Sequence, residues 1–223
     1  MSFKVERLPD AFFATKAAAR IATDLSAAES IVLTGGTTAE KIYGPLAETG
    51  LSFARLEIFF SDERCVPPDD DASNFAMATR TLLHQGSAGP VHRMRGEDEP
   101  FAAAAAYSEE VVSFAPGGFD LVLLGMGADC HIGAMFPGSP ALDEDEALCA
   151  AIDRPDAMRG LTLTPRALVS AKKILLLVSG AAKAEAVARV IEGNEDPHMC
   201  PARLLAGHED VTFLLDEAAA AHL

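Results

Sequence analysis

The chain has 223 residues and a formal net charge of −15, with 33 Asp and Glu against 18 Lys and Arg. Its pI near 4.7 argues against a nucleic-acid partner, because binding to phosphates needs a basic patch and the sequence shows none. No apolar run approaches the roughly 18 residues that a membrane-spanning helix needs. The N-terminal stretch MSFKVERLPD lacks a signal-peptide pattern. We therefore expect one domain over residues 1–223 in the cytoplasm, without a membrane or nucleic-acid partner.

The four cysteines are far apart in the sequence, at positions 65, 130, 149 and 200, and form no CxxC pair. This spacing favours free thiols over a zinc site. For assembly, the sequence indicates no more than a monomer or a small homo-oligomer.

The first strand and its glycine turn are expected near the N-terminus. Residues 10–28 are rich in alanine with apolar residues at helical spacing, and residues 30–33 form a short apolar run. Gly35 and Gly36 follow the run, and a helix is expected over 38–48. This order directs backbone N–H groups and the positive helix end to one point, as in phosphate sites. It is not a P-loop, because the GxxxxGK[ST] spacing is absent. A plain tight turn is an equally good interpretation.

A charged cluster follows the next predicted strand, which covers residues 56–60. The cluster is Ser61-Asp62-Glu63-Arg64, and Ser73-Asn74 is expected to cap a helix over 74–84. A surface ion-pair network is the simple interpretation. The position at the C-terminal end of a strand favours a functional one.

The rest of the chain continues the alternation of strands and helices. Periodicity and turn residues predict strands at 120–124, 161–164, 172–178 and 211–215, with 91–94 as a candidate for a further short strand. They also predict helices at 101–114 and 183–191, a helical turn at 201–205, and a terminal helix capped by Asp216. About six strands that alternate with helices indicate an α/β fold with a doubly wound, mostly parallel sheet flanked by helices.

The central apolar strand leads into the most reactive stretch of the chain. Gly125-Met126-Gly127 can turn sharply, and Asp129, Cys130 and His131 follow at once. In an open parallel sheet, ligands bind just past the C-terminal strand ends, where these residues fall. Lys183 follows another strand and enters a helix against its dipole, so a bound anion would compensate its charge. A solvated lysine is the plain alternative.

Several classes of chemistry fit this sequence poorly. It has no HExxH motif for a metal and no GxSxG elbow for a serine nucleophile. Gly125-Met126-Gly127 lacks the third glycine of a dinucleotide site, because Cys130 stands there. What remains is acid–base chemistry by His131 on a small phosphorylated molecule.

The motifs together resemble the 6-phosphogluconolactonases, which share a Rossmann-like fold with the glucosamine-6-phosphate deaminases and ribose-5-phosphate isomerases. The similarity covers nearly the whole chain and rests on LTGGTTAEKIYGPLA, FFSDERCVPPDDDASNFAMA, FDLVLLGMGADCHIGAMFPGSPAL, LLLVSGAAKAEAV and FLLDEAAA. The deaminases typically carry a tyrosine where Arg64 stands, which favours the lactonases.

The resemblance implies hydrolysis of 6-phosphoglucono-δ-lactone to 6-phosphogluconate in the oxidative pentose phosphate pathway, without metal or cofactor. It makes His131 the general base, which takes a proton from water and returns it to the ring oxygen. Asp129 or Asp62 would orient the imidazole or the substrate hydroxyls. The remaining residues that it implies bind the substrate and its phosphate: Gly35, Gly36, Thr37, Arg64 and Lys183. How Arg64 divides its work between the phosphate and the developing oxyanion stays open.

Two departures from the family pattern concern the site. The family's usual Asp-Gly-His-Thr-Ala-Ser run reads Asp-Cys-His-Ile-Gly-Ala over residues 129–134. We expect Cys130 to keep the positive φ of the glycine that it replaces and its thiol to react with alkylating agents. The family's arginine before the Thr-x-Thr strand is Gly160 here; Arg159 is the candidate replacement, Arg166 is the alternative, and neither need fill the role.

Two rival functions fit the same motifs. The first is a sugar-phosphate isomerase or glucosamine-6-phosphate deaminase on the same fold. The second is a sugar-phosphate-binding protein whose catalytic loop has drifted at Cys130. Turnover of fresh 6-phosphogluconolactone separates all three.

Overall fold

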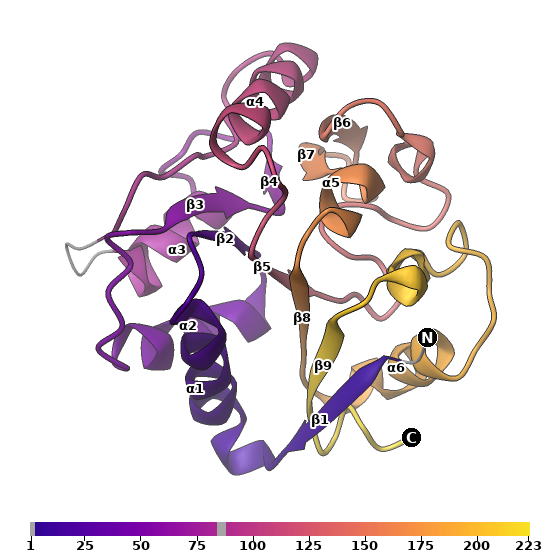
Figure 1. Cartoon of the computed structure of the whole chain (residues 1–223). Coiled ribbons are helices and arrows are strands. Elements are labelled where there is room, and N and C mark those ends of the chain that lie inside the picture. Colours follow the sequence, from indigo (N-terminus) through magenta and orange to yellow (C-terminus); the bar gives the residue numbers. More distant parts are fainter. Residues whose placement is uncertain (1–2, 84–87) are drawn as a thin grey trace.

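The structure is a computed structural model that describes residues 3–83 and 88–223. Within these residues a six-stranded sheet has the order β1-β9-β8-β5-β2-β3, and every neighbouring pair is parallel (Figure 1). Its strands are β1 (Lys4–Leu8), β2 (Ser30–Leu33), β3 (Glu57–Phe60), β5 (Leu121–Gly125), β8 (Lys173–Val178) and β9 (Val211–Asp216). The predicted doubly wound parallel sheet is confirmed.

Helices cover both faces of this sheet. Side chains alternate along each strand, so Val122 and Leu124 face one core cluster and Leu121 and Leu123 face the other. The first cluster is covered by α4 (Pro100–Phe114), α5 (Pro165–Val169) and α6 (Ala184–Ile191), and the second by α1 (Phe13–Leu25), α2 (Thr37–Ala47) and α3 (Asn74–Thr81). In the described part of the chain, no helix is both long and apolar enough to cross a membrane.

A small antiparallel sheet stands at the end of β3. Among the described residues it comprises β4 (Asp62–Arg64), β7 (Arg159–Leu163) and β6 (Cys149–Asp153), in the order β4-β7-β6. The strand expected over 161–164 belongs to this sheet, and β4 and β6 were not predicted. Ser61 joins the two sheets, because its N–H donates to Leu33 O at 2.8 Å and its carbonyl accepts from Leu163 N at 2.8 Å.

Other elements differ from the sequence-based expectation. Val91 forms only a bridge to Ile58 where a strand was expected, and residues 217–222 form turns instead of a helix. The seven residues after β9 are too few for a stable helix, although Asp216 Oδ1 does accept from Ala219 N at 2.7 Å. β1 was missed because its sequence KVERL is mostly polar, as edge strands allow. The predicted end of the third helix, at residue 84, lies outside the described residues.

Buried Glu63 ties β4 to the start of α3. Its carboxylate accepts hydrogen bonds from Ser73 Oγ at 2.9 Å and from the N–H groups of Arg64, Asn74 and Phe75 at 2.8, 2.7 and 2.9 Å. Burial raises the pKa of Glu63, and these hydrogen bonds oppose it. As predicted, Ser73 is the N-cap of α3, and its Oγ accepts from Ala76 N at 3.1 Å. The first turn of α3 is thereby fixed against β4.

We expect Ser73→Ala to lower the free energy of unfolding by about 1–2 kcal/mol, because it removes both an N-cap and a donor to a buried carboxylate. Urea unfolding measures the change. Ser113→Ala is the matched control: Ser113 is exposed on α4 and donates only to Glu109 O, so its change should stay within about 0.5 kcal/mol. Equal losses in the two variants would contradict this role for Ser73.

Candidate active site

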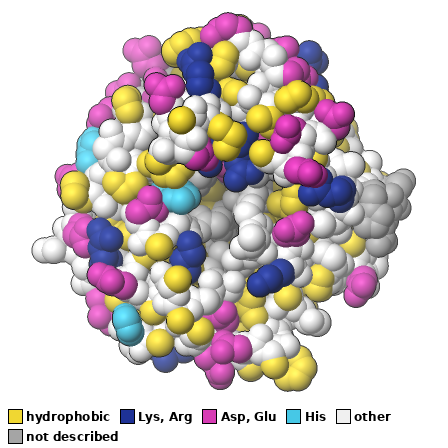
Figure 2. Space-filling model, turned by 180° about the vertical axis from the view of Figure 1, so that it is seen from behind, with side chains coloured by type: hydrophobic (Ala, Val, Ile, Leu, Met, Phe, Trp, Pro, Cys, Tyr) yellow, Lys and Arg dark blue, Asp and Glu magenta, His cyan; other side chains and the backbone are white. Residues whose placement is uncertain are grey.

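A pocket of about 180 Å³ lies at the C-terminal ends of β2, β5 and β8 and beside β4. The space-filling view shows a hollow near the centre of one face, with Lys, Arg and His side chains around it (Figure 2). The predicted site residues that line the pocket are Gly35, Gly36, Thr37, Asp62, Arg64, His131 and Lys183. Parallel strands bring them together because their C-terminal ends meet at one edge of the sheet.

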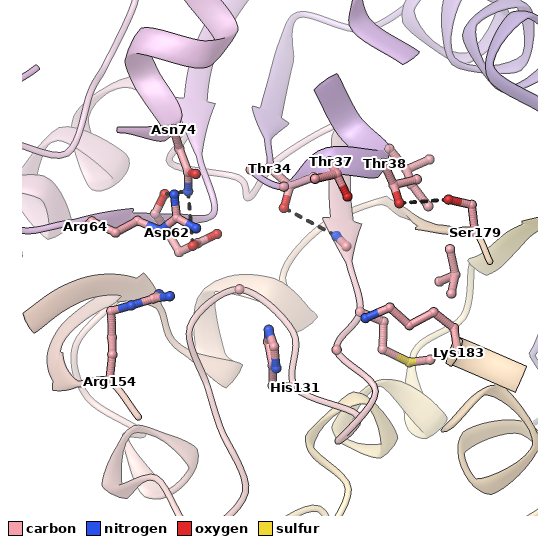
Figure 3. A pocket seen from close by; sticks show the side chains of 18 residues that line it. Thr34, Thr37, Thr38, Asp62, Arg64, Asn74, His131, Arg154, Ser179 and Lys183 are labelled. Carbon is pink, nitrogen blue, oxygen red and sulfur yellow. Dashed lines mark hydrogen bonds between the residues drawn. The ribbon is translucent and has the colours of Figure 1, made fainter. Parts of the chain in front are cut away.

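One end of the pocket is built for an anion. Gly36, at φ 93°, is the N-cap of α2, and the first N–H groups of a helix have no partner within it. Thr38 Oγ1 and Ser179 Oγ lie 3.0 Å apart beside them, and Lys183 lines the same side of the pocket (Figure 3). We call this group of Gly36, Thr37, Thr38, Ser179 and Lys183 the helix-terminus end. Its amides, hydroxyls and ammonium group suit a phosphate.

His131 is held by Asp129, with its Nδ1 2.6 Å and its N–H 3.2 Å from Asp129 Oδ1. Partial burial opposes the charged form of Asp129, but attraction to His131 and hydrogen bonds from it hold the pKa of Asp129 below its ordinary value. A charged Asp129 keeps the proton on Nδ1, so Nε2 carries the lone pair that a general base needs. Gly127 makes the pairing possible, because a Cβ there would lie 2.1 Å from His131 Nδ1. Asp129 itself is not among the described residues that line the pocket, and it acts on the pocket through His131.

Cys130 keeps the backbone conformation of a glycine. Its φ is 69°, so the prediction of a positive φ is confirmed. Its side chain is 0% exposed and packs toward α6, with Sγ 3.9 Å from Ala186 O. This burial argues against the expected reaction of the thiol with alkylating agents, because the sulfur faces the core.

Asp62 and Arg64 extend the pocket along β4. Asp62 accepts from Ser61 Oγ at 2.6 Å and from Asn74 Nδ2 at 3.1 Å, which fixes its carboxylate. Arg64 donates through Nη1 to Ala72 O. Its Nε is buried and has no hydrogen-bond partner among residues 3–83 and 88–223. A buried donor without a partner is costly, and a ligand in the pocket would satisfy it.

Two predicted arginines lie elsewhere. Arg159 stacks over the Phe101 ring at 5.2 Å and approaches Asp153 at 3.6 Å, while Arg166 donates to Glu146 O. Neither is among the described residues that line the pocket, whereas Arg154 is. Sequence analysis missed Arg154, because an Arg-Pro-Asp run reads as an ordinary turn.

These parts suit acid–base chemistry on a small anionic molecule. They combine an anion-binding helix terminus, a histidine with an available Nε2, and guanidinium groups. Over the described residues, no three His, Cys, Asp or Glu side chains are grouped so as to hold a metal ion.

We expect Cys130→Gly to be more stable than Cys130→Ala. At positive φ a Cβ costs about 1–2 kcal/mol, whereas the extra flexibility of unfolded glycine costs only about 0.5–1 kcal/mol. Melting temperatures of the two variants check this order. Cys149 in β6 is the matched control, buried and in a strand, and there the alanine variant should be the more stable one. The same order at both positions would contradict strain at Cys130.

Comparison with known proteins agrees with this geometry. The family described as glucosamine-6-phosphate isomerases/6-phosphogluconolactonase matches residues 10–213. The chain is 37% identical to the 6-phosphogluconolactonase of Mycobacterium tuberculosis over an alignment of 247 positions, which covers 100% of this chain and 99% of that protein.

Solved structures extend the likeness. A 6-phosphogluconolactonase from Trypanosoma cruzi has a TM-score of 0.88 at 27% identity, over 100% of this chain and 98% of that chain. A monomeric glucosamine-6-phosphate deaminase has a TM-score of 0.89 at 26% identity, over 99% of this chain and 100% of that chain. The match to residues 10–213 spans most of the sequence, and the chain belongs to the family of glucosamine-6-phosphate isomerases and 6-phosphogluconolactonases.

Proposed function

We propose that the protein hydrolyses 6-phosphoglucono-δ-lactone to 6-phosphogluconate, a step of the oxidative pentose phosphate pathway. The observation that carries the proposal is the Asp129–His131 pair, with Nδ1 engaged at 2.6 Å and the ring lining a pocket that also offers an anion site. The Mycobacterium tuberculosis relative, similar over its full length, is named as this enzyme. The fold alone does not separate lactonase from deaminase, since proteins of both names share it.

The reaction needs a base beside the lactone carbonyl. His131 Nε2 takes a proton from water as the water oxygen bonds to C1, and Asp129 stabilises the imidazolium that forms. The carbonyl oxygen becomes an oxyanion. When the C1–ring-oxygen bond breaks, the ring oxygen receives the proton from His131 and becomes the C5 hydroxyl. C1 is then a carboxylic acid, which releases its proton to solvent and becomes the carboxylate of the product.

The phosphate is assigned to the helix-terminus end. Substrate and product both carry it on C6, so it acts as a handle that does not change during the reaction. The first N–H groups of α2, which have no partner within the helix, would stabilise a dianion there together with the Lys183 charge. When the phosphate is bound there, C1, at the opposite end of the substrate, lies beside His131.

Turnover of freshly generated 6-phosphogluconolactone tests the proposal. The wild-type protein should consume the lactone well above the spontaneous rate. His131→Gln should lower the catalysed rate by about 10²–10⁴-fold, the usual worth of a general base, with an unchanged melting temperature. Release of ammonia from glucosamine 6-phosphate without lactone hydrolysis would replace the proposal with the deaminase.

Lys183→Met should lower the affinity for 6-phosphogluconate by about 10–100-fold, because charge-assisted hydrogen bonds to phosphate are strong. The affinity for gluconate, which has no phosphate, should change by less than about twofold. Calorimetric titration of both ligands measures the difference. Lys41→Met is the matched control for net charge, since Lys41 is exposed on α2 and outside the lining of the pocket. Equal losses for the two ligands would remove Lys183 from phosphate binding.

A further inference from the structure

We propose that Arg154 binds the C1 oxygen of the substrate, which is the carbonyl oxygen of the lactone, the oxyanion of the intermediate and part of the carboxylate of the product. The assignment rests on the proposed function, because it takes a phosphorylated lactone as the ligand. It deepens that function by giving a specific arginine to the reacting end of the molecule.

Arg154 is built into the site. Its side chain is only 10% exposed, it lines the pocket, and Figure 3 shows it reaching inward from the turn between β6 and β7. Its N–H donates to Met158 O at 2.9 Å, which closes the turn. Asp156 accepts from Nε at 3.2 Å and from Nη2 at 3.1 Å. Among the described residues Nη1 has no partner, so one donor of a largely buried guanidinium stays available to a ligand.

Gly160 makes room for this side chain. A Cβ at Gly160 would lie 3.1 Å from Arg154 Cδ and 3.0 Å from Glu63 O. The Arg154 side chain therefore lies against β7 at Gly160, where a Cβ would be closer to it than an ordinary contact.

That end is the one next to His131. The Phe136 ring packs against the His131 ring at 4.5 Å and under the Arg154 guanidinium at 5.4 Å. Arg64 is also near, because it pairs with Gly160 in the β4–β7 register. In Figure 3, Arg64 and Arg154 lie on one side of His131, and Thr38, Ser179 and Lys183 lie on the other. We call Arg64 and Arg154 the arginine end.

The two ends of the pocket match the two charged groups of the product. The phosphate on C6 has the helix-terminus end, and His131 must stand beside C1 to deliver water. The arginine end is then left for the oxygen on C1. Positive groups there stabilise the negative charge that appears only as water attacks, so Arg154 should raise kcat more than it improves substrate binding.

The test compares two ligands that differ only at C1. 6-Phosphogluconate has a carboxylate there, and glucitol 6-phosphate has a neutral CH₂OH group. Arg154→Gln should lower the affinity for 6-phosphogluconate by about 10–100-fold, as expected for lost charge-assisted hydrogen bonds. The affinity for glucitol 6-phosphate should fall by less than about twofold. For lactone hydrolysis, kcat should fall by about 10–100-fold with KM changed much less.

Arg159→Gln is the matched control, since it removes the same charge from the same hairpin outside the pocket. It should change neither ligand affinity nor kcat. Arg154→Lys, which keeps the charge but loses the planar fork, should give the same selectivity with a smaller loss. It serves as the second variant should Arg154→Gln be poorly folded by its melting temperature.

Equal losses for both ligands would overturn the assignment, because Arg154 would then contact the phosphate. So would unchanged affinities and an unchanged kcat. The two binding measurements do not need turnover. A wild-type protein that binds both ligands but leaves the lactone intact would therefore refute the proposed function, while the ligand comparison still decides the place of Arg154.

Discussion

The parallel direction of every strand in the large sheet is the constraint on which the site depends. It places the C-terminal ends of β2, β3, β5 and β8 at one edge, although their residues lie far apart in the sequence. Thr34 links three of these ends: its Oγ1 lies 3.2 Å from Ser61 Oγ and accepts from Gly125 N at 3.3 Å (Figure 3). The glycine turn, the β4 carboxylates and the histidine loop are thus positioned against one another by backbone geometry.

The small sheet lines one side of the pocket with residues of β4 and of the β6–β7 turn. Only Ser61 separates β4 from β3. β7 pairs with β4, and β6 pairs with β7. This pairing places Arg154, in the β6–β7 turn, in the lining of the pocket. Two glycines leave room for side chains of the site. A Cβ at Gly127 would collide with the Asp129–His131 pair, and a Cβ at Gly160 would lie 3.1 Å from Arg154 Cδ.

The sequence predicted the large sheet well because its buried strands are continuous apolar runs. Ser30–Leu33 was placed to the residue, and β5 and β8 to within one residue. It failed where the signal is local and polar. β1 looks like a charged tail, β4 is three polar residues, and the hairpin of β6 and β7 depends on pairing with β4. Arg154 was missed for the same reason, since its place is set by long-range pairing and by the space at Gly160.

A crystal structure of the protein with 6-phosphogluconate tests the central claim most directly, namely that the pocket holds one anion at each end with His131 beside C1. The account predicts the phosphate against Thr38 and Lys183, and the carboxylate within hydrogen-bonding distance of Arg64 and Arg154, with His131 Nε2 facing C1. The reverse orientation, with the phosphate on the two arginines and the carboxylate at the start of α2, would contradict it.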